Sequence, residues 1–66
     1  MELTGFVTAT SPINVYSEEN FQVICQIPNG TCVLIDEEQS TKEFYKICTS
    51  AGIEGYCSNY NIRIQE

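Results

Sequence analysis

The stretch from residue 22 to residue 35, QVICQIPNGTCVLI, most constrains the fold of this chain. Its two apolar runs, residues 23–27 and 31–35, have the β-branched composition that is typical of strands. Between them, Pro28 removes a backbone donor and fixes φ, and Asn29-Gly30 tolerates the positive φ of a tight turn. The pattern predicts an antiparallel hairpin onto which the other strands pack.

The other apolar segments are short and are separated by turn residues. We predict strands at residues 3–9, 13–16, 44–49, 53–57 and 62–64, and a single 3-10 turn at residues 58–61. No stretch shows helical periodicity over about ten residues. Five to seven short antiparallel strands predict one all-β domain over residues 1–66, a small and partly open barrel with its core at about residues 5–64.

The size of the chain limits what its interior can hold. A domain of 66 residues buries only about 60% of the surface that its unfolded chain exposes. A deep, enclosed active site would consume this small core. We therefore expect a shallow groove on the surface.

The charge excludes two classes of partner. Nine acidic residues face three basic ones, for a net charge of −6, which argues against nucleic acid and against anionic membrane surfaces. No apolar run approaches the roughly 20 residues of a membrane span, and the N-terminus lacks a signal-peptide pattern. A chain that begins at its native start would be cytoplasmic, whereas a module of a secreted or phage lytic protein would act outside the cell or at the cell wall.

The four cysteines do not form a metal motif. Cys25, Cys32, Cys48 and Cys57 have no CxxC spacing, and the chain has no histidine, so the usual zinc spacings are absent and we expect no metal or cofactor. Cys25 and Cys57 lie among inward apolar residues and are predicted to be part of the core. Cys32 and Cys48 are predicted to lie on an outward face.

A second hairpin, from residue 31 to residue 49, allows a prediction of strand register if it is centred on Ser40. The predicted opposite pairs are Val33–Ile47 and Ile35–Tyr45 on the core side, and Leu34–Lys46 and Cys32–Cys48 on the other side. Opposite Cβ atoms lie about 4.5–5.5 Å apart, which suits a disulfide only in the closer pairs. A Cys32–Cys48 disulfide is one alternative, and two free thiols are the other.

Five segments, in order and with matching gaps, resemble the bacterial SH3 (SH3b) family. The segments are residues 5–9 (GFVTA), 13–17 (INVYS), 23–33 (VICQIPNGTCV), 44–47 (FYKI) and 52–59 (GIEGYCSN). They are similar to the family patterns GxVTA, LNVRS, VIGxLxxGxxV, WYKV and GxxGWVSS. The chain departs from the family at four places: Tyr16 replaces Arg, Glu18-Glu19 replaces Gly-Pro, and Phe44 and Tyr56 replace Trp.

The resemblance implies an SH3-like barrel that binds bacterial peptidoglycan through a shallow groove. Modules of this family hold a hydrolase on its substrate by contacting peptide stems or cross-bridges, in autolysins or phage endolysins. This chain is more acidic and richer in cysteine than many wall-targeting members. An alternative interpretation is a cytoplasmic or phage protein-interaction module that binds an extended, amine-bearing peptide or assembles with itself. The oligomeric state is left open by the sequence.

Catalytic chemistry has few candidates in this chain. Nucleophilic catalysis needs a base beside the nucleophile, and without histidine only Lys42 or Lys46 could serve, both in or beside a charged hairpin. The acidic residues fall on predicted loops, where a carboxyl pKa is not raised as glycosidase chemistry requires. We therefore expect a protein that is not an enzyme.

Aromatic surface is what remains as a candidate binding site. Alternation places some of these rings outward, and tyrosine supplies contact area with a hydroxyl that fixes orientation. The predicted groove residues are Tyr16, Phe44, Tyr56 and Tyr60, with hydrogen bonds at the groove edge from Glu18, Asn20 and Asn59. The place of Tyr60 depends on how residues 58–62 align with the family. The alternative is that these rings cover a thin core and bind nothing.

Overall fold

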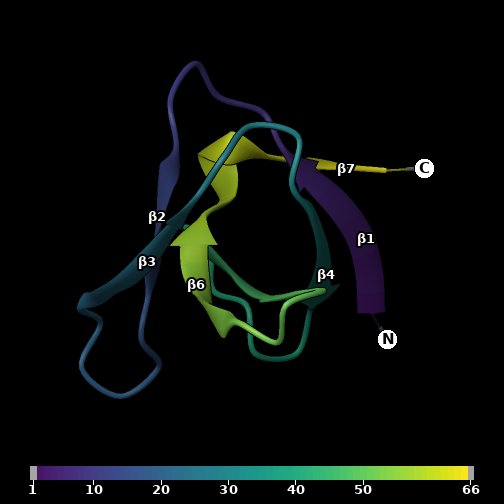
Figure 1. Ribbon diagram of the computed structural model, residues 1–66. Helices are drawn as coiled ribbons and strands as arrows, with labels where there is room; N and C mark the ends of the chain where they lie inside the picture. Colours follow the sequence, from purple (N-terminus) through teal and green to yellow (C-terminus); the bar gives the residue numbers. More distant parts are fainter. Residues whose placement is uncertain (1, 66) are drawn as a thin grey trace.

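The computed structural model describes residues 2–65, which form one antiparallel sheet. The elements are β1 (Glu2–Val7), β2 (Ile13–Tyr16), β3 (Val23–Ile27), β4 (Cys32–Asp36), β5 (Phe44–Thr49), β6 (Glu54–Ser58), the 3-10 turn η1 (Asn59–Asn61) and β7 (Ile62–Ile64). The strand order is β3-β2-β6-β5-β4-β1-β7, and the sheet curls into a half-barrel (Figure 1). The predicted all-β, partly open barrel with one 3-10 turn is therefore confirmed.

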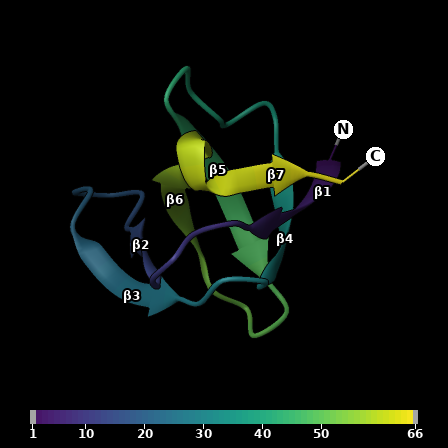
Figure 2. The same ribbon diagram turned by 90° about the horizontal axis from the view of Figure 1, so that it is seen from above.

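The sheet has two edges that lie on opposite sides of the molecule. Figure 2 shows β2 and β3 together on one side, and β1 and β7 with both chain ends on the other. Among the strands of residues 2–65, β3 pairs only with β2, and β7 pairs only with β1. The β2–β3 pair is thus an arm that joins the rest of the sheet through β2.

The core occupies the concave face of the half-barrel, and simple alternation selects its residues. β2, β4 and β6 each alternate between buried and less buried positions. The buried apolar side chains are Val7, Ile13, Val15, Ile27, Val33, Ile35, Ile47, Cys57 and Ile62, with Cys25 and Tyr45 partly buried against them. Full burial of one Val or Ile side chain contributes about 1.5–3 kcal/mol. The inward positions predicted for Cys25 and Cys57 are confirmed.

The predicted hairpin at residues 22–35 is wrong, although its two strands exist. β3 and β4 are not neighbours in the sheet. The turn between them is held by β1 instead: the Gly30 amide donates to the Val7 carbonyl at 2.8 Å, and the Val7 amide donates to the Thr31 carbonyl at 2.9 Å. The Asn29 side chain also accepts from the Ala9 amide at 3.0 Å. These bonds direct β4 toward β1 and leave β3 with β2.

The predicted β4–β5 register is wrong by two residues. The observed pairs are Val33–Thr49, Leu34–Cys48, Ile35–Ile47 and Asp36–Lys46. Ser40 does not centre the turn but closes it, because its Oγ donates to the Asp36 carbonyl at 2.7 Å and accepts from the Lys46 amide at 3.0 Å. A shift of two residues keeps every side chain on its predicted face. Cys32 and Cys48 are not opposite each other, and all four cysteines are free.

Replacing Gly55 with alanine should destabilise the fold by about 1–3 kcal/mol, because a crowded interior resists added atoms. A Cβ at Gly55 would lie 2.8 Å from Val15 Cγ1 and closer still to the Tyr16 carbonyl oxygen, so β2 and β6 would have to separate. Urea unfolding of the wild type and Gly55→Ala measures the loss. The exposed control Ser11→Ala should stay within about 0.5 kcal/mol of the wild type, and equal stability of Gly55→Ala would contradict the close approach.

Alkylation of the native protein without reductant should modify Cys32 first and Cys57 last. Cys32 is exposed, whereas Cys57 is fully buried and its burial raises the pKa of the thiol to about 12, so that little reactive thiolate forms. Peptide mass spectrometry over time gives the order of labelling. Early labelling of Cys57, or a Cys32 that labels only after reduction, would contradict the structure.

Candidate functional site

Four aromatic rings gather on the outer face of the sheet, where β2, β5 and β6 meet. Tyr16, the last residue of β2, pairs with Tyr56 of β6, and Phe44 is the first residue of β5. Alternation turns these side chains outward, because strand neighbours such as Val15 are buried in the core. Phe21, from the loop between β2 and β3, is the fourth ring. We call these four residues the aromatic cluster.

Phe21 is the ring that contacts the other three. Its ring stacks on Tyr16 with centroids 4.9 Å apart and an interplanar angle of 2°. It meets the edge of Phe44 at 4.8 Å and 82°, and lies 5.8 Å from Tyr56. Tyr16 and Phe44 also meet edge to face, at 6.1 Å. Such pairs contribute about 0.5–1.5 kcal/mol each beyond their buried area.

The loop of residues 17–22 holds Phe21 in a backbone conformation that large side chains rarely adopt. Its φ is 57°, which costs about 1–2 kcal/mol for a residue with a Cβ. Hydrogen bonds close the loop: the Ser17 amide donates to the Gln22 carbonyl at 2.8 Å, and the Phe21 amide donates to the Ser17 carbonyl at 3.1 Å. The side chain of Asn20 accepts from the Ser17 hydroxyl and the Gln22 amide. The predicted groove residue Asn20 therefore shapes the loop.

A register shift in the β2–β3 pair accompanies this arrangement. Val15 pairs with Cys25, but Tyr16 pairs with Val23, so one residue of β3 is skipped. Irregularities of this β-bulge type re-aim side chains and are common beside functional sites. Sequence reasoning missed Phe21 because neither the bulge nor a positive φ leaves a mark in the residue pattern. Its one signal was an aromatic residue at the end of a polar loop.

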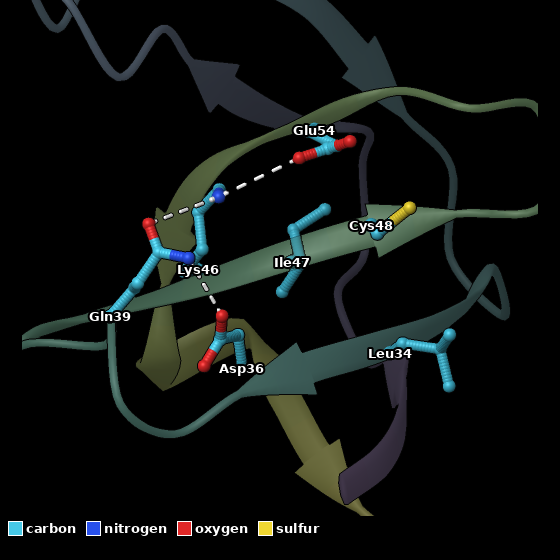
Figure 3. A pocket seen from close by; sticks show the side chains of 7 residues that line it. All are labelled: Leu34, Asp36, Gln39, Lys46, Ile47, Cys48 and Glu54. Carbon is cyan, nitrogen blue, oxygen red and sulfur yellow. Dashed lines mark hydrogen bonds and ion pairs between the residues drawn. The ribbon is translucent and has the colours of Figure 1, made fainter. Parts of the chain in front are cut away.

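Lys46 lies beside the cluster on the same outer face, opposite Tyr56, and is only 5% exposed. Its ammonium is 3.0 Å from a carboxylate oxygen of Glu18 and 3.7 Å from one of Glu54. It also lies 3.5 Å from Oε1 of Gln39 (Figure 3). The loop that carries Phe21 is thus tied to β5 by an ion pair. Glu18, predicted at the groove edge, takes part in this contact.

The ammonium of Lys46 stays charged in this surrounding. Burial alone would lower its pKa, but the hydrogen bond and charge of Glu18, together with the charge of Glu54, outweigh burial and raise the pKa above its usual 10.5. A general base at neutral pH needs a pKa near the operating pH. Lys46 therefore serves as a structural cation that joins the loop to β5 and β6.

A polar hollow of about 160 Å³ lies next to Lys46. Its lining consists of Leu34, Asp36, Gln39, Lys46, Ile47, Cys48 and Glu54 (Figure 3). The Gln39 side chain donates to Asp36 at 2.7 Å, and this hydrogen bond lowers the pKa of the Asp36 carboxyl. The Tyr56 hydroxyl donates to the Gln39 carbonyl at 3.0 Å, so the same turn also holds one ring of the aromatic cluster.

The two remaining predicted residues lie outside the cluster. The Asn59 side chain donates to the Lys42 carbonyl at 2.8 Å, and the Asn59 backbone amide donates to the Glu43 carbonyl at 3.0 Å. Asn59 therefore holds the segment that precedes Phe44. Tyr60 is 92% exposed on η1. Within residues 2–65, the ring contacts link Tyr60 to none of the four clustered rings. The structure thus brings Tyr16, Phe44, Tyr56 and Glu18 together and leaves Tyr60 apart.

Comparison with known proteins adds no family. No protein-family model matches the chain, and no curated protein matches its sequence. In the part of the chain that the structure describes, no three acidic or cysteine side chains form a metal-binding group. No helix among residues 2–65 is long and apolar enough to cross a membrane.

Above neutral pH, the stability difference between the wild type and Lys46→Met should change only as Lys46 loses its charge in the alkaline range. Because the folded-state pKa of Lys46 is raised above 10.5, its charge contributes stability fully below that pH and loses the contribution as the pH rises through the folded-state pKa. Urea unfolding from about pH 7 to pH 11.5 should show a constant difference up to about pH 10, followed by a fall in the relative stability of the wild type. Because the charge of Tyr56 also raises the pKa of Lys46, both proteins are compared in the Tyr56→Phe background, where parallel curves throughout would contradict the ion pairs.

Proposed function

We propose that this protein is a non-catalytic binding module whose aromatic cluster receives a peptide, and that the peptide belongs to bacterial peptidoglycan. The observation that carries the proposal is the cluster itself: four rings on the outside of a small barrel, with Phe21 43% exposed. A small domain that turns large aromatic side chains outward loses apolar area that its core could have buried. Such outward rings typically mark binding surfaces.

The cluster is suited to binding because contacts within the protein hold its rings in place without a ligand. Stacking fixes Phe21 on Tyr16, and the ion pair of Glu18 with Lys46 anchors the same loop to β5. A preorganised surface loses little conformational entropy on binding, so more of the contact energy appears as affinity. A backbone held at a rarely adopted φ, as at Phe21, is a further feature of binding loops.

The resemblance to SH3b modules supports the wall as the source of the peptide. The family-like segments contribute Tyr16, Phe44 and Tyr56, and these residues are three of the four clustered rings. In this role the module would keep an attached hydrolase near its substrate and raise its local concentration. The cluster would contact stem or cross-bridge peptides through ring faces and tyrosine hydroxyls.

The charge beside the cluster supports a second candidate, a module for an amine-bearing peptide of another protein. The loop that carries Phe21 also carries Glu18 and Glu19, Glu43 precedes Phe44, and the net charge is −6. Acidic groups at the rim of a binding surface attract a basic partner and make association sensitive to salt. The two candidates therefore differ in ligand and in salt dependence.

Sedimentation with purified Gram-positive sacculi tests the proposal. We expect the wild type to sediment at low and moderate salt, and Phe44→Ala and Phe21→Ala to weaken binding by about tenfold or more, as for central aromatic residues of an interface. Tyr60→Ala is the matched control: it removes an exposed tyrosine that lies outside the cluster, and it should bind as the wild type does. Circular dichroism and urea unfolding confirm that each variant is folded.

Several outcomes would contradict the proposal. Failure of the wild type to bind sacculi from several species would remove the wall ligand, and salt-sensitive capture of a lysine-rich peptide would then favour the second candidate. Loss of binding in Tyr60→Ala together with full binding in Phe44→Ala would move the site from the aromatic cluster to η1.

A further inference from the structure

A second hollow lies on the outer face where β1, β4 and β5 run side by side. It has a volume of about 190 Å³, and its lining consists of Thr4, Cys32, Val33, Leu34, Cys48, Thr49 and Ser50. It is at the opposite end of β5 from Phe44, so it is separate from the aromatic cluster. The proposed function does not use any of these residues.

Two of the four cysteines meet in this hollow. Leu34 lies opposite Cys48, and Cys32 is two residues from Leu34 on the same face of β4. The two cysteines are therefore diagonal neighbours, for which Cα atoms are typically about 7–8 Å apart and Cβ atoms somewhat closer. This separation is too long for an unstrained disulfide, whose Cβ atoms lie about 3.5–4.5 Å apart. A metal ion held between two sulfurs spans a longer gap than a direct S–S bond does.

The lining residues indicate which kind of metal ion could lie between the two cysteines. The hollow contains no carboxylate and no charged side chain, so hard cations that prefer oxygen ligands have little to bind. Thiolates prefer soft cations, and Cu(I) accepts two sulfur ligands in a nearly linear arrangement. Leu34 provides an apolar wall beside the two cysteines, and such a wall limits water around a bound ion. Cys32 is exposed and provides the entry path.

We propose that Cys32 and Cys48 form a two-thiolate site for a soft monovalent cation, Cu(I). Binding forms two S–Cu bonds and releases the two thiol protons, with no change in the oxidation state of sulfur or copper. Cys25 and Cys57 lie on the other side of the sheet, at or against the core, and take no part. The site would be the same whether or not the aromatic cluster binds a peptide.

Anaerobic titration of the reduced protein with Cu(I), in competition with a chromophoric Cu(I) chelator, tests this site. We expect one Cu(I) per chain, counted by native mass spectrometry. Cys32→Ser and Cys48→Ser should each weaken binding by about 100-fold or more, since loss of even an outer-shell partner costs about 10–100-fold. Cys25→Ser is the matched control, because it removes a thiol that lies on the concave face, and it should bind as the wild type does.

Three results would overturn the proposal. The first is no retention of Cu(I) against the chelator by the folded wild type. The second is binding that survives in Cys32→Ser or in Cys48→Ser, or that is lost equally in Cys25→Ser. The third is rapid formation of a Cys32–Cys48 disulfide when a mild disulfide oxidant is added to the metal-free protein, because this would contradict the separation of the two cysteines on which the site depends.

Discussion

The close contact between β2 and β6 is the feature on which the rest of this structure depends. β2 joins the main sheet through the Tyr16–Tyr56 pair, and Gly55 lets the two backbones approach because it has no Cβ. β3 lies at the edge of the sheet and is joined to it through β2. The same contact therefore attaches the β2–β3 arm to the half-barrel and sets two rings of the aromatic cluster side by side.

The outer face carries a second, smaller packed unit above the sheet. Phe21 covers Tyr16 and meets Phe44, while Lys46 is buried beside them with Glu18 and Glu54 as its partners. A buried ammonium is tolerated only when it is paired, and the loop of residues 17–22 supplies one of its two carboxylates. Ring stacking and ion pairing thus hold one loop by two independent means, which explains how Phe21 keeps an uncommon φ.

The local pattern predicted much of the fold and part of the candidate site. The strands, the inward positions of Cys25 and Cys57, and the outward positions of Tyr16 and Phe44 follow from alternation between neighbours in the chain, and the 3-10 turn follows from a short polar segment between two strands. The true partners of β3 and β4, and the register between β4 and β5, did not follow from the local pattern. Hydrogen bonds between Val7 and the turn, and between Ser40 and both Asp36 and Lys46, decided those features.

By itself the sequence determined which segments are strands and which face of each strand turns inward, because a period of two residues is a property of adjacent residues. The tertiary structure alone decided which strands pair, because pairing depends on contacts between residues far apart in the chain. It likewise decided that Phe21 joins the cluster, that Tyr60 stays apart, and that Cys32 and Cys48 share one hollow. Each of these depends on a bulge, a turn or a register that long-range hydrogen bonds select.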